Sequence, residues 1–499
     1  MEPKVKDDEL MTPSRQRRLL LQAIGSATLL SGLGLGGSSV AQEQRPTLAQ
    51  DGVLDVVVIG AGLSGLTSAR DLLSAGCESF MVLEARNRVG GRTYNHDLGN
   101  GVISEAGGQW IGPGQTAIAD LARELDVRTF PTYYQGKSVY MAGNAQVKHD
   151  ISAGVGFDPK LVAKLNEMSR KVPSKAPWTA PDAAALDKLS VGDWMAEQGV
   201  GLVDRVGFNA TMSLTYGSTP AGMGLLHYLA LINTSDCNLE SLEGIKDGAQ
   251  ETRFVGGSQI LSTRMAEILG DRVKLSVPVR RIVGWDRDVV ELHTDQGIVR
   301  ARQVIAAINP ALCNQIAFEP PLPEGRDQLQ RRWPAYAPLR KTVHVYDRPF
   351  WRDEGLNGQI VQTDGPVIFA YDNSPPDGSV GVINAFVRSG SLASDADSAR
   401  DTLSAIYAKA FGDAALHPTQ FHDQDWGKVD QWSLTCLSPI PPGFWKTWGE
   451  FLRPPVGRLI WSGAETADYW AGAMDGAVRA GHHAALQALQ ALARAGRSA

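Results

Sequence analysis

The sequence predicts an α/β protein built on a parallel β-sheet and interleaved with a second, α+β part. Three observations support this fold class. A complete strand, turn, helix and strand unit occupies residues 55–92. A further run typical of a buried strand, Gln303–Pro310, returns hundreds of residues later. A strand that runs into a glycine-rich helix start follows at residues 460–481.

The first of these units has the pattern of a phosphate-binding turn. Its apolar run Val56–Ile59 predicts a buried strand that leads into the spacing G-x-G-x-x-G. The first glycine permits a tight turn, the second lets the backbone approach a pyrophosphate, and the third lets the next helix pack closely. That helix, predicted over residues 64–74, directs its amide N–H groups at the phosphates. The expected contacts are Gly60, Ala61, Gly62, Leu63, Ser64 and Gly65.

A second strand, predicted over residues 79–83, ends on Glu84, the position expected for a carboxylate that binds a ribose hydroxyl. The segment after it places Ala85, Arg86, Gly91 and Arg92 beside the same site, where guanidinium groups can meet phosphate oxygens. The strand before, the helix after and the terminal acid together indicate a dinucleotide-binding Rossmann unit. A glycine-rich turn without a ligand is the alternative.

The pattern E-A-R-x-R-x-G-G-R-T over residues 84–93 resembles the flavin-containing amine oxidases, the family of monoamine oxidase, polyamine oxidase and L-amino acid oxidase. The resemblance implies FAD rather than NAD. It also implies a glutathione-reductase-like FAD-binding domain with an interleaved substrate-binding domain, and its motifs extend over about residues 55–485. By resemblance, the further residues that contact FAD are Gly108, Gln109, Trp110, Val279, Gly463, Glu465, Ala473 and Met474.

The domain boundaries follow partly from composition and partly from this resemblance. The predicted FAD-binding domain comprises residues 50–130, 245–335 and 425–499, and the predicted substrate domain comprises residues 131–244 and 336–424. The most apolar helical segment of the substrate domain is Gly224–Ile232. It is interpreted as core in preference to a cavity lining.

Composition excludes several classes of function. The 499 residues are 43% hydrophobic and 20% charged, as in ordinary soluble proteins, and the net charge of −6 gives no basic surface for nucleic acid. Four widely spaced cysteines and nine histidines form neither C-x-x-C nor H-E-x-x-H, so neither a disulfide framework nor a metal site is expected. Beyond the N-terminal region, no run of some twenty apolar residues suggests a polytopic membrane protein.

Residues 1–41 resemble a bacterial twin-arginine signal peptide. Arg17 and Arg18 precede a mildly apolar run that closes on the small-x-small pattern Ser39–Ala41. This predicts a periplasmic protein whose electrons go to O2 or to a carrier such as a c-type cytochrome. A cytoplasmic protein with a basic tail, or a membrane anchor, is the alternative. The sequence leaves the oligomeric state open, a homodimer being one option.

Lys341 is the predicted catalytic residue. Period-two alternation places it on the same strand face as Val343 and Val345, an unusual environment for an ammonium group. Its spacing to Pro349-Phe350-Trp351 resembles that of the family's lysine, which holds a water molecule beside flavin N5. A strand-end lysine that reaches solvent is the alternative.

Two departures from monoamine oxidase limit the resemblance. The cysteine that attaches FAD in that enzyme is replaced by Thr435, which favours non-covalent FAD, although attachment through Cys436 stays open. The two tyrosines that frame the amine correspond to about Cys436 and Ala473, so the aromatic cage is missing. Cys436, Trp432 and Trp470 are therefore the candidate substrate contacts, with packing as the alternative for either tryptophan.

The resemblance implies removal of a hydride from the carbon next to an amine nitrogen, followed by hydrolysis of the imine to a carbonyl compound and a smaller amine or ammonia. The expected substrate is a primary or secondary amine, either a monoamine or an alkaloid-derived amine such as one of nicotine degradation. Alternatives are a polyamine or putrescine oxidase, an L-amino acid oxidase, a carotenoid-desaturase-like enzyme and a non-catalytic FAD-binding scaffold.

Overall fold

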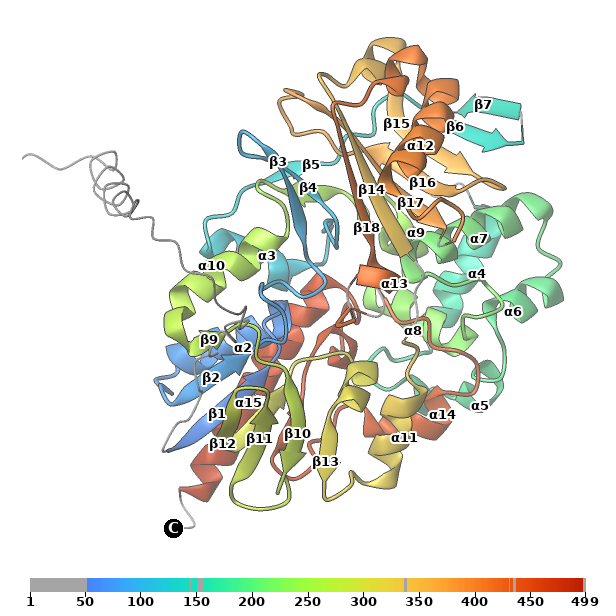
Figure 1. Ribbon diagram of the computed structural model, residues 1–499. Helices are drawn as coiled ribbons and strands as arrows, with labels where there is room; N and C mark the ends of the chain where they lie inside the picture. The colour runs from blue at the N-terminus through green and yellow to red at the C-terminus, as the bar shows by residue number, and fades with distance from the viewer. Residues whose placement is uncertain are drawn as a thin grey trace, which may run out of the picture. The chain divides into compact units, whose positions relative to one another are not determined.

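The computed structural model describes residues 52–143, 145–149, 157–335, 339–388, 390–429, 431–433 and 437–496. The predicted leader over residues 1–41 and Cys436 lie outside these described residues. Within the described part, the chain forms two large β-sheets with helices packed against them (Figure 1).

The first sheet has eight strands in the order β13-β10-β11-β12-β1-β2-β9, with β19 also paired to β12. β1 lies between β2 and β12 and is parallel to both, and β19 is parallel to β12. The parallel centre thus joins three distant parts of the chain. The strands are β1 (Val53–Ile59), β2 (Phe80–Leu83), β9 (Val273–Lys274), β10 (Val279–Val283), β11 (Val290–Thr294), β12 (Gly297–Ala306), β13 (Ala317–Glu319) and β19 (Leu459–Trp461).

The uninterrupted apolar run of β1 is explained by burial on both faces of the sheet. Val56 and Val58 pack against the helices of one face, whereas Val57 and Ile59 pack with residues of β10 and β11 on the other. Strand side chains alternate between faces, so a strand covered on both sides needs apolar residues throughout. The covering helices are α2 (Leu63–Ser74), α3 (Thr116–Glu124), α10 (Gln259–Leu269) and α15 (Met474–Ala495).

The second sheet has seven strands in the order β18-β14-β17-β16-β15-β6-β7. β14 is antiparallel to both of its neighbours, and all eight of its residues are buried. Lys341 therefore occupies the interior of a central strand. The strands are β6 (Lys137–Ala142), β7 (Ala145–His149), β14 (Leu339–Tyr346), β15 (Leu356–Gln362), β16 (Val367–Asp372), β17 (Gly381–Arg388) and β18 (Gln420–Asp425).

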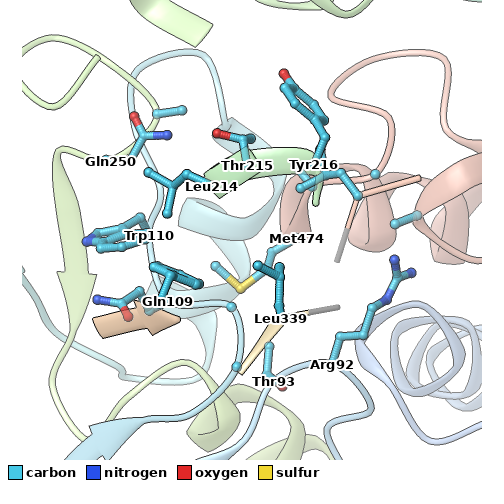
Figure 2. A pocket seen from close by; sticks show the side chains of 18 of the residues that line it. Arg92, Thr93, Gln109, Trp110, Leu214, Thr215, Tyr216, Gln250, Leu339 and Met474 are labelled. Carbon is cyan, nitrogen blue, oxygen red and sulfur yellow. The ribbon is translucent and has the colours of Figure 1, made fainter. Parts of the chain in front are cut away.

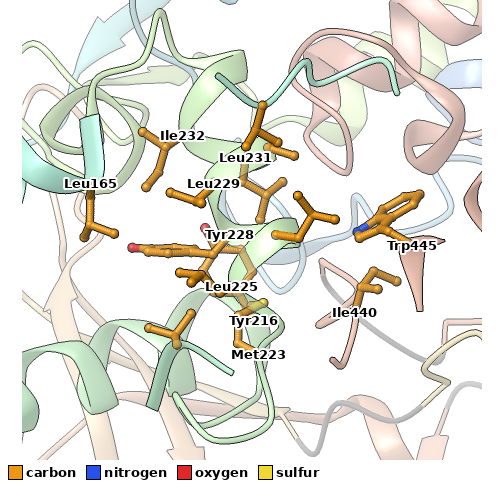
Figure 3. Packing of buried hydrophobic residues seen from close by; sticks show 14 of the residues in the cluster. Leu165, Tyr216, Met223, Leu225, Tyr228, Leu229, Leu231, Ile232, Ile440 and Trp445 are labelled. Atoms are coloured by element: carbon orange, nitrogen blue, oxygen red, sulfur yellow. The ribbon is translucent and has the colours of Figure 1, made fainter. Parts of the chain in front are cut away.

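A helical region forms the largest apolar core outside the sheets. Its centre is α8, in which every side chain except that of Asn233 is buried, as the interpretation of this segment as core predicts. Figure 3 shows Tyr228 and the leucines of α8 surrounded by Leu165, Tyr216 and Trp445. The helices of this region are α4 (Pro159–Ser169), α5 (Ala183–Leu186), α6 (Val191–Glu197), α7 (Leu202–Tyr216), α8 (Leu225–Thr234) and α9 (Leu239–Glu243).

Shorter elements connect these parts. Four short strands form the antiparallel pairs β3–β4 and β5–β8. The first pair leads into the glycine-rich segment at residues 105–112, and the second follows it in the chain. The remaining elements are β3 (Asn95–Gly99), β4 (Val102–Glu105), β5 (Thr129–Pro131), β8 (Thr252–Phe254), α11 (Glu324–Arg332), α12 (Ala396–Phe411), α13 (Trp426–Val429) and α14 (Trp445–Trp448).

Among the described residues, no helix combines the length and the apolar character needed to cross a membrane. In the same part of the chain, no three histidine, cysteine, aspartate or glutamate side chains group as they would around a metal ion. Cys77, Cys237 and Cys313 are free thiols.

Gly65 gives a direct test of the close packing at the start of α2. A Cβ atom on Gly65 would lie 1.9 Å from the Gly60 carbonyl oxygen, so Gly65→Ala forces the turn and the helix apart. We expect a loss of about 1–3 kcal/mol in the free energy of unfolding, measured by urea denaturation. Gly201→Ala is the control, because a Cβ there has nothing within 4 Å. Equal losses in both variants would contradict the packing role.

Candidate functional site

A cavity of about 1050 Å³ lies between the carboxyl ends of β1 and β2, the second sheet and the helical region. It gathers most of the site residues that the sequence predicts. Ala61, Gly65 and Glu465 are buried outside its wall, and Cys436 is not among the described residues. The predicted residues that line it are Gly60, Gly62, Leu63, Ser64, Glu84, Ala85, Arg86, Gly91, Arg92, Gly108, Gln109, Trp110, Val279, Lys341, Trp432, Gly463, Trp470, Ala473 and Met474.

The glycine motif forms one end of this cavity. Gly60 has a φ of +102°, which only glycine adopts readily, and its N–H donates to the Leu83 carbonyl. Gly62 precedes α2, and a Cβ on Gly91 would lie 3.4 Å from the Gly62 Cα. The two glycines therefore leave bare backbone on the wall in front of the N-terminus of α2. Backbone N–H groups and the helix dipole make such a place suitable for phosphate.

Glu84 is fixed at the end of β2 by the turn that it faces. Its Oε2 accepts a hydrogen bond from the Ala61 N–H at 2.7 Å, and its Oε1 accepts one from the Arg86 N–H at 2.9 Å. The Arg86 guanidinium in turn donates to the Ser433 hydroxyl at 2.6 Å. The carboxylate is thus held at the cavity wall at the position where the sequence predicts a ribose contact.

Residues of the C-terminal segment complete this end of the site. The Gly463 N–H donates to the Ser64 hydroxyl at 3.0 Å, which joins the turn after β19 to the start of α2. Arg92 lines the cavity and pairs with Glu465 at 2.7 Å. Glu465 lies outside the wall as the partner of Arg92, and its predicted contact with the cofactor stays a prediction.

Lys341 enters the cavity from β14 and is 2% exposed. Its Nζ donates to the Gly107 carbonyl oxygen at 3.0 Å and to Gln109 Oε1 at 2.6 Å. The ammonium also lies 5.2 Å from the ring centroid of Phe386 and 5.8 Å from those of Trp110 and Tyr371, within the range of cation–π attraction. The ammonium is buried, so the alternative of a strand-end lysine that reaches solvent is wrong.

A buried polar network supports Lys341 through Gln109. The Tyr371 hydroxyl donates to Gln109 Oε1 at 2.6 Å, and Gln109 Nε2 donates to Asn373 Oδ1 at 2.9 Å. Asn373 donates in turn to Glu105, which Arg253 contacts at 2.8 Å. Burial alone raises the pKa of Glu105, but the Arg253 charge and the Asn373 hydrogen bond outweigh it and hold that pKa below its ordinary value.

Sequence reasoning missed the aromatic wall around Lys341. Phe386 lies opposite Lys341 in the register of β17 and β14, and Phe369 lies opposite Phe386 in β16. Tyr371 follows on the same strand and packs against Trp110 with ring centroids 4.9 Å apart. Alternation within β16 and β17 is visible in the sequence, but the pairing of these strands with β14 is not.

The two tryptophans predicted as substrate contacts have different surroundings. Trp432 lies under the guanidinium of Arg280, the residue that follows Val279 in the chain, and Val279 is predicted to contact adenine. Trp470 is 3% exposed and packs in the core of the helical region while also lining the cavity. Both tryptophans line the cavity, and a contact of either with the substrate stays a prediction.

The opposite end of the cavity is lined by one side of α7 and by the segment after α9. Figure 2 shows Leu214, Thr215 and Tyr216 on one side of the cavity and Arg92 and Thr93 on the other. The remaining residues at this end include Val206, Ala210, Glu243 and Gln250. Sequence reasoning missed these residues, because Val206 and Ala210 belong to a helical stripe indistinguishable from core, and Glu243 and Gln250 belong to no recognised motif.

The residues of the cavity fit FAD, the cofactor that the sequence resemblance implies. A volume of about 1050 Å³ is at the upper limit of small-molecule sites, as a large cofactor and a substrate together require. Gly62 and Gly91 leave open backbone for a pyrophosphate, and Glu84 presents a carboxylate at the end of β2. Ala473 and the N-terminus of α15 lie on the wall where a helix dipole would stabilise negative charge on the flavin.

The Glu105–Arg253 pair gives a stability test of this site. Both side chains are almost fully buried, so Arg253→Met leaves an unpaired carboxylate and should cost about 3–5 kcal/mol at neutral pH. Because the pKa of Glu105 is lowered in the folded protein, the pair stabilises the fold above the ordinary carboxyl value of 4.5. That stabilisation is lost as the pH falls through the lowered pKa.

Without the Arg253 charge, burial should raise the pKa of Glu105, so the carboxylate of Arg253→Met should take up a proton above pH 4.5. Urea denaturation from pH 7 down to pH 4 should therefore show a deficit for Arg253→Met that shrinks with acidification. Arg280→Met is the matched control, because the Arg280–Asp295 pair is exposed and should contribute about 1 kcal/mol or less. A deficit that does not depend on pH would show that Arg253 acts through packing alone.

Comparison with known proteins identifies the family. The model of the family described as flavin containing amine oxidoreductase matches residues 63–489. The AofH protein of Mycobacterium tuberculosis, named as a flavin-containing monoamine oxidase, is 37% identical over 447 residues, which cover 87% of this chain and 96% of that protein. The horse flavin-containing amine oxidase A is 32% identical over 483 residues, 91% of this chain and 88% of that protein.

Solved structures agree with this result. The cyclohexylamine oxidase of Brevibacterium oxydans has a TM-score of 0.81 at 31% identity, covering 88% of this chain and all of that chain. A wild-type putrescine oxidase bound to putrescine has a TM-score of 0.78 at 32% identity, covering 88% of this chain and 99% of that one. The predicted fold class is confirmed, whereas the domain boundaries stay predictions. The chain therefore belongs to the flavin-containing amine oxidoreductases, enzymes whose cofactor is FAD.

Proposed function

We propose that this protein oxidises a primary or secondary amine, either a monoamine or an alkaloid-derived amine such as one of nicotine degradation, with FAD bound non-covalently. The observation that carries the proposal is the buried ammonium of Lys341, held by Gly107 and Gln109 inside an aromatic wall. Burial of an ammonium lowers the stability of the fold, so its presence here points to a function. The cavity around it is large enough for an organic amine.

In the proposed reaction, the bond between hydrogen and the carbon next to the amine nitrogen breaks. The hydrogen leaves with both electrons, and the carbon and nitrogen form an iminium ion, which becomes an imine when its nitrogen loses a proton. FAD, when bound, supplies the acceptor for this hydride. Water then adds to the imine, which separates into a carbonyl compound and an amine or ammonia. The electrons pass finally to O2 or to a periplasmic carrier such as a c-type cytochrome.

The protein supplies positioning and desolvation for this reaction. The amine must lose its proton before the carbon is oxidised, and a cavity wall of Trp110, Tyr371 and Phe386 favours the neutral amine by excluding water. Lys341 is proposed to hold a water molecule at the reacting end through its Nζ. Gln109 accepts hydrogen bonds from both Lys341 and Tyr371 and so orients the ammonium.

An amino acid substrate is less well supported than a simple amine. An L-amino acid oxidase needs an arginine to bind the substrate carboxylate. Arg86 and Arg92 are the arginines among the described residues of the cavity wall, and both lie at the glycine-motif end with Glu84 and Glu465 as partners. The proposed substrate therefore carries no carboxylate next to its nitrogen.

We also propose that the protein is exported by the twin-arginine route, on the basis of the Arg17-Arg18 pair and the residues that follow it. Replacing both arginines by lysine should retain the protein in the cytoplasm, whereas Arg15→Lys alone should not. Fractionation of cells and detection of the full-length and processed chains measure this. Equal periplasmic amounts of both variants would contradict the proposed route.

Anaerobic reduction of the bound flavin tests the proposed reaction. The purified holoprotein is mixed with monoamines, diamines, alkaloid-derived amines and amino acids while absorbance is followed near 450 nm, about the band of oxidised flavin. Bleaching by one class identifies the substrate. Lys341→Met should retain FAD, but its flavin should be reduced more slowly than that of the wild type by a factor of about 100 or more. The exposed Lys409→Met is the control. A yellow protein that no amine bleaches would support the desaturase or scaffold alternatives instead.

A further inference from the structure

Glu243, at the end of α9, has an environment that the reaction above does not explain. Its carboxylate lines the same cavity as Lys341, on the side formed by the helical region. Its Oε1 accepts a hydrogen bond from the Tyr216 hydroxyl at 2.9 Å, and its Oε2 accepts one from the Thr215 hydroxyl at 3.3 Å. The Tyr228 hydroxyl approaches Oε1 at 3.4 Å. All three partners are neutral hydroxyl groups.

Glu243 is half-buried. Among the fully buried carboxylates, Asp187 accepts backbone N–H groups of Trp445 and Lys446, and four others are neutralised differently. Each forms an ion pair with an arginine, whereas no lysine, arginine or histidine of the described residues forms one with Glu243. The four pairs are Glu105–Arg253, Asp372–Arg352, Glu465–Arg92 and Asp475–Arg479. A carboxylate withdrawn from water without a cation is costly, and burial accordingly raises the pKa of Glu243 to about 7.

The position of Glu243 suggests which kind of cation it binds. Thr215 and Tyr216, which hold its carboxylate, lie across the cavity from Arg92 and Thr93 at the glycine-motif end (Figure 2). The wall near them contains the apolar Leu214 and Leu242 and, from the segment after α9, the polar Lys246 and Gln250. Glu243 and Lys341 line the same cavity, so a substrate whose oxidised carbon lies near Lys341 can reach this carboxylate with its other end.

We propose that Glu243 binds a second basic nitrogen of the substrate, at the end remote from the carbon that is oxidised. The proposal rests on the proposed amine oxidation and narrows its substrates to amines with two basic nitrogens. The second nitrogen is either an aliphatic ammonium, as in a diamine, or a protonated heteroaromatic nitrogen, as in a pyridine. Both present an N–H donor and a positive charge, which a carboxylate binds by a charge-assisted hydrogen bond.

Matched substrate pairs test this proposal. Butane-1,4-diamine is compared with butylamine, and 4-(3-pyridyl)butylamine with 4-phenylbutylamine, by the kcat/KM of anaerobic flavin reduction. The wild type should prefer the member with the second nitrogen in at least one pair, and the pair that shows the preference distinguishes the ammonium from the pyridine. In Glu243→Gln, this preference should fall by about 10- to 100-fold, the usual loss for a hydrogen bond to a charged group.

Two further variants serve as controls. Glu240→Gln changes an exposed glutamate of the same helix and should keep the wild-type preference. Glu243→Asp retains the charge and should keep part of the preference, so it tests the site even where Glu243→Gln fails to fold. FAD content and melting temperature are measured for each variant. An unchanged preference in Glu243→Gln, or the absence of a preference in the wild type, would overturn the proposal.

Calorimetric titration of butane-1,4-diamine and 4-(3-pyridyl)butylamine into the oxidised holoprotein separates this proposal from the proposed function. Should no amine reduce the flavin, tighter binding of either ligand to the wild type than to Glu243→Gln would still support the carboxylate site. Equal binding of both ligands to both proteins would overturn it. Reduction of the flavin by amines without regard to a second nitrogen would retain the proposed function and reject the role of Glu243.

Discussion

The interior ammonium of Lys341 is the constraint on which the arrangement of the site depends. A charged group in the interior of a strand must have its donors satisfied by fixed acceptors. Here the acceptors, Gly107 and Gln109, come from the segment after β4, whereas the lysine comes from the second sheet. The two hydrogen bonds that the Lys341 ammonium donates therefore hold the second sheet against the glycine-rich segment that lines the cofactor end. The hydrogen bonds of Gln109 to Tyr371 and Asn373 extend this coupling to β16 and the residue that follows it.

The two ends of the cavity are built on different physical principles. The cofactor end uses bare backbone and helix termini, because phosphate is recognised by N–H groups that glycine leaves accessible. The other end presents side chains: the aromatic rings and the Lys341 ammonium, which strand pairing brings together, and the Glu243 carboxylate of α9. Gly62 and Gly91 can be recognised from a short stretch of sequence, whereas Lys341, Tyr371 and Glu243 line one cavity only in the folded chain.

This difference decides how much could be predicted from the sequence. β1, α2 and β2 were predicted with boundaries correct to within a few residues, because the glycine spacing fixes where a strand ends and a helix begins. Lys341 stood out because a lysine interrupts an apolar alternation. Phe386 and Tyr371 did not, since an aromatic residue in a strand is ordinary core. Glu243 ends a short amphipathic segment whose polar side chains would ordinarily face water, and only tertiary packing turns it towards the cavity.

The hydrogen bond between Gly463 and Ser64 has a consequence for how the holoprotein matures. It ties the first helix of the cofactor end to a turn contributed by the last part of the chain, and Ala473 and Met474 complete the same wall. A nascent chain on the ribosome lacks this wall until synthesis is nearly finished. We therefore expect FAD to bind only when synthesis of the chain is nearly finished. Chains that end before β19 lack part of the wall of the cofactor site.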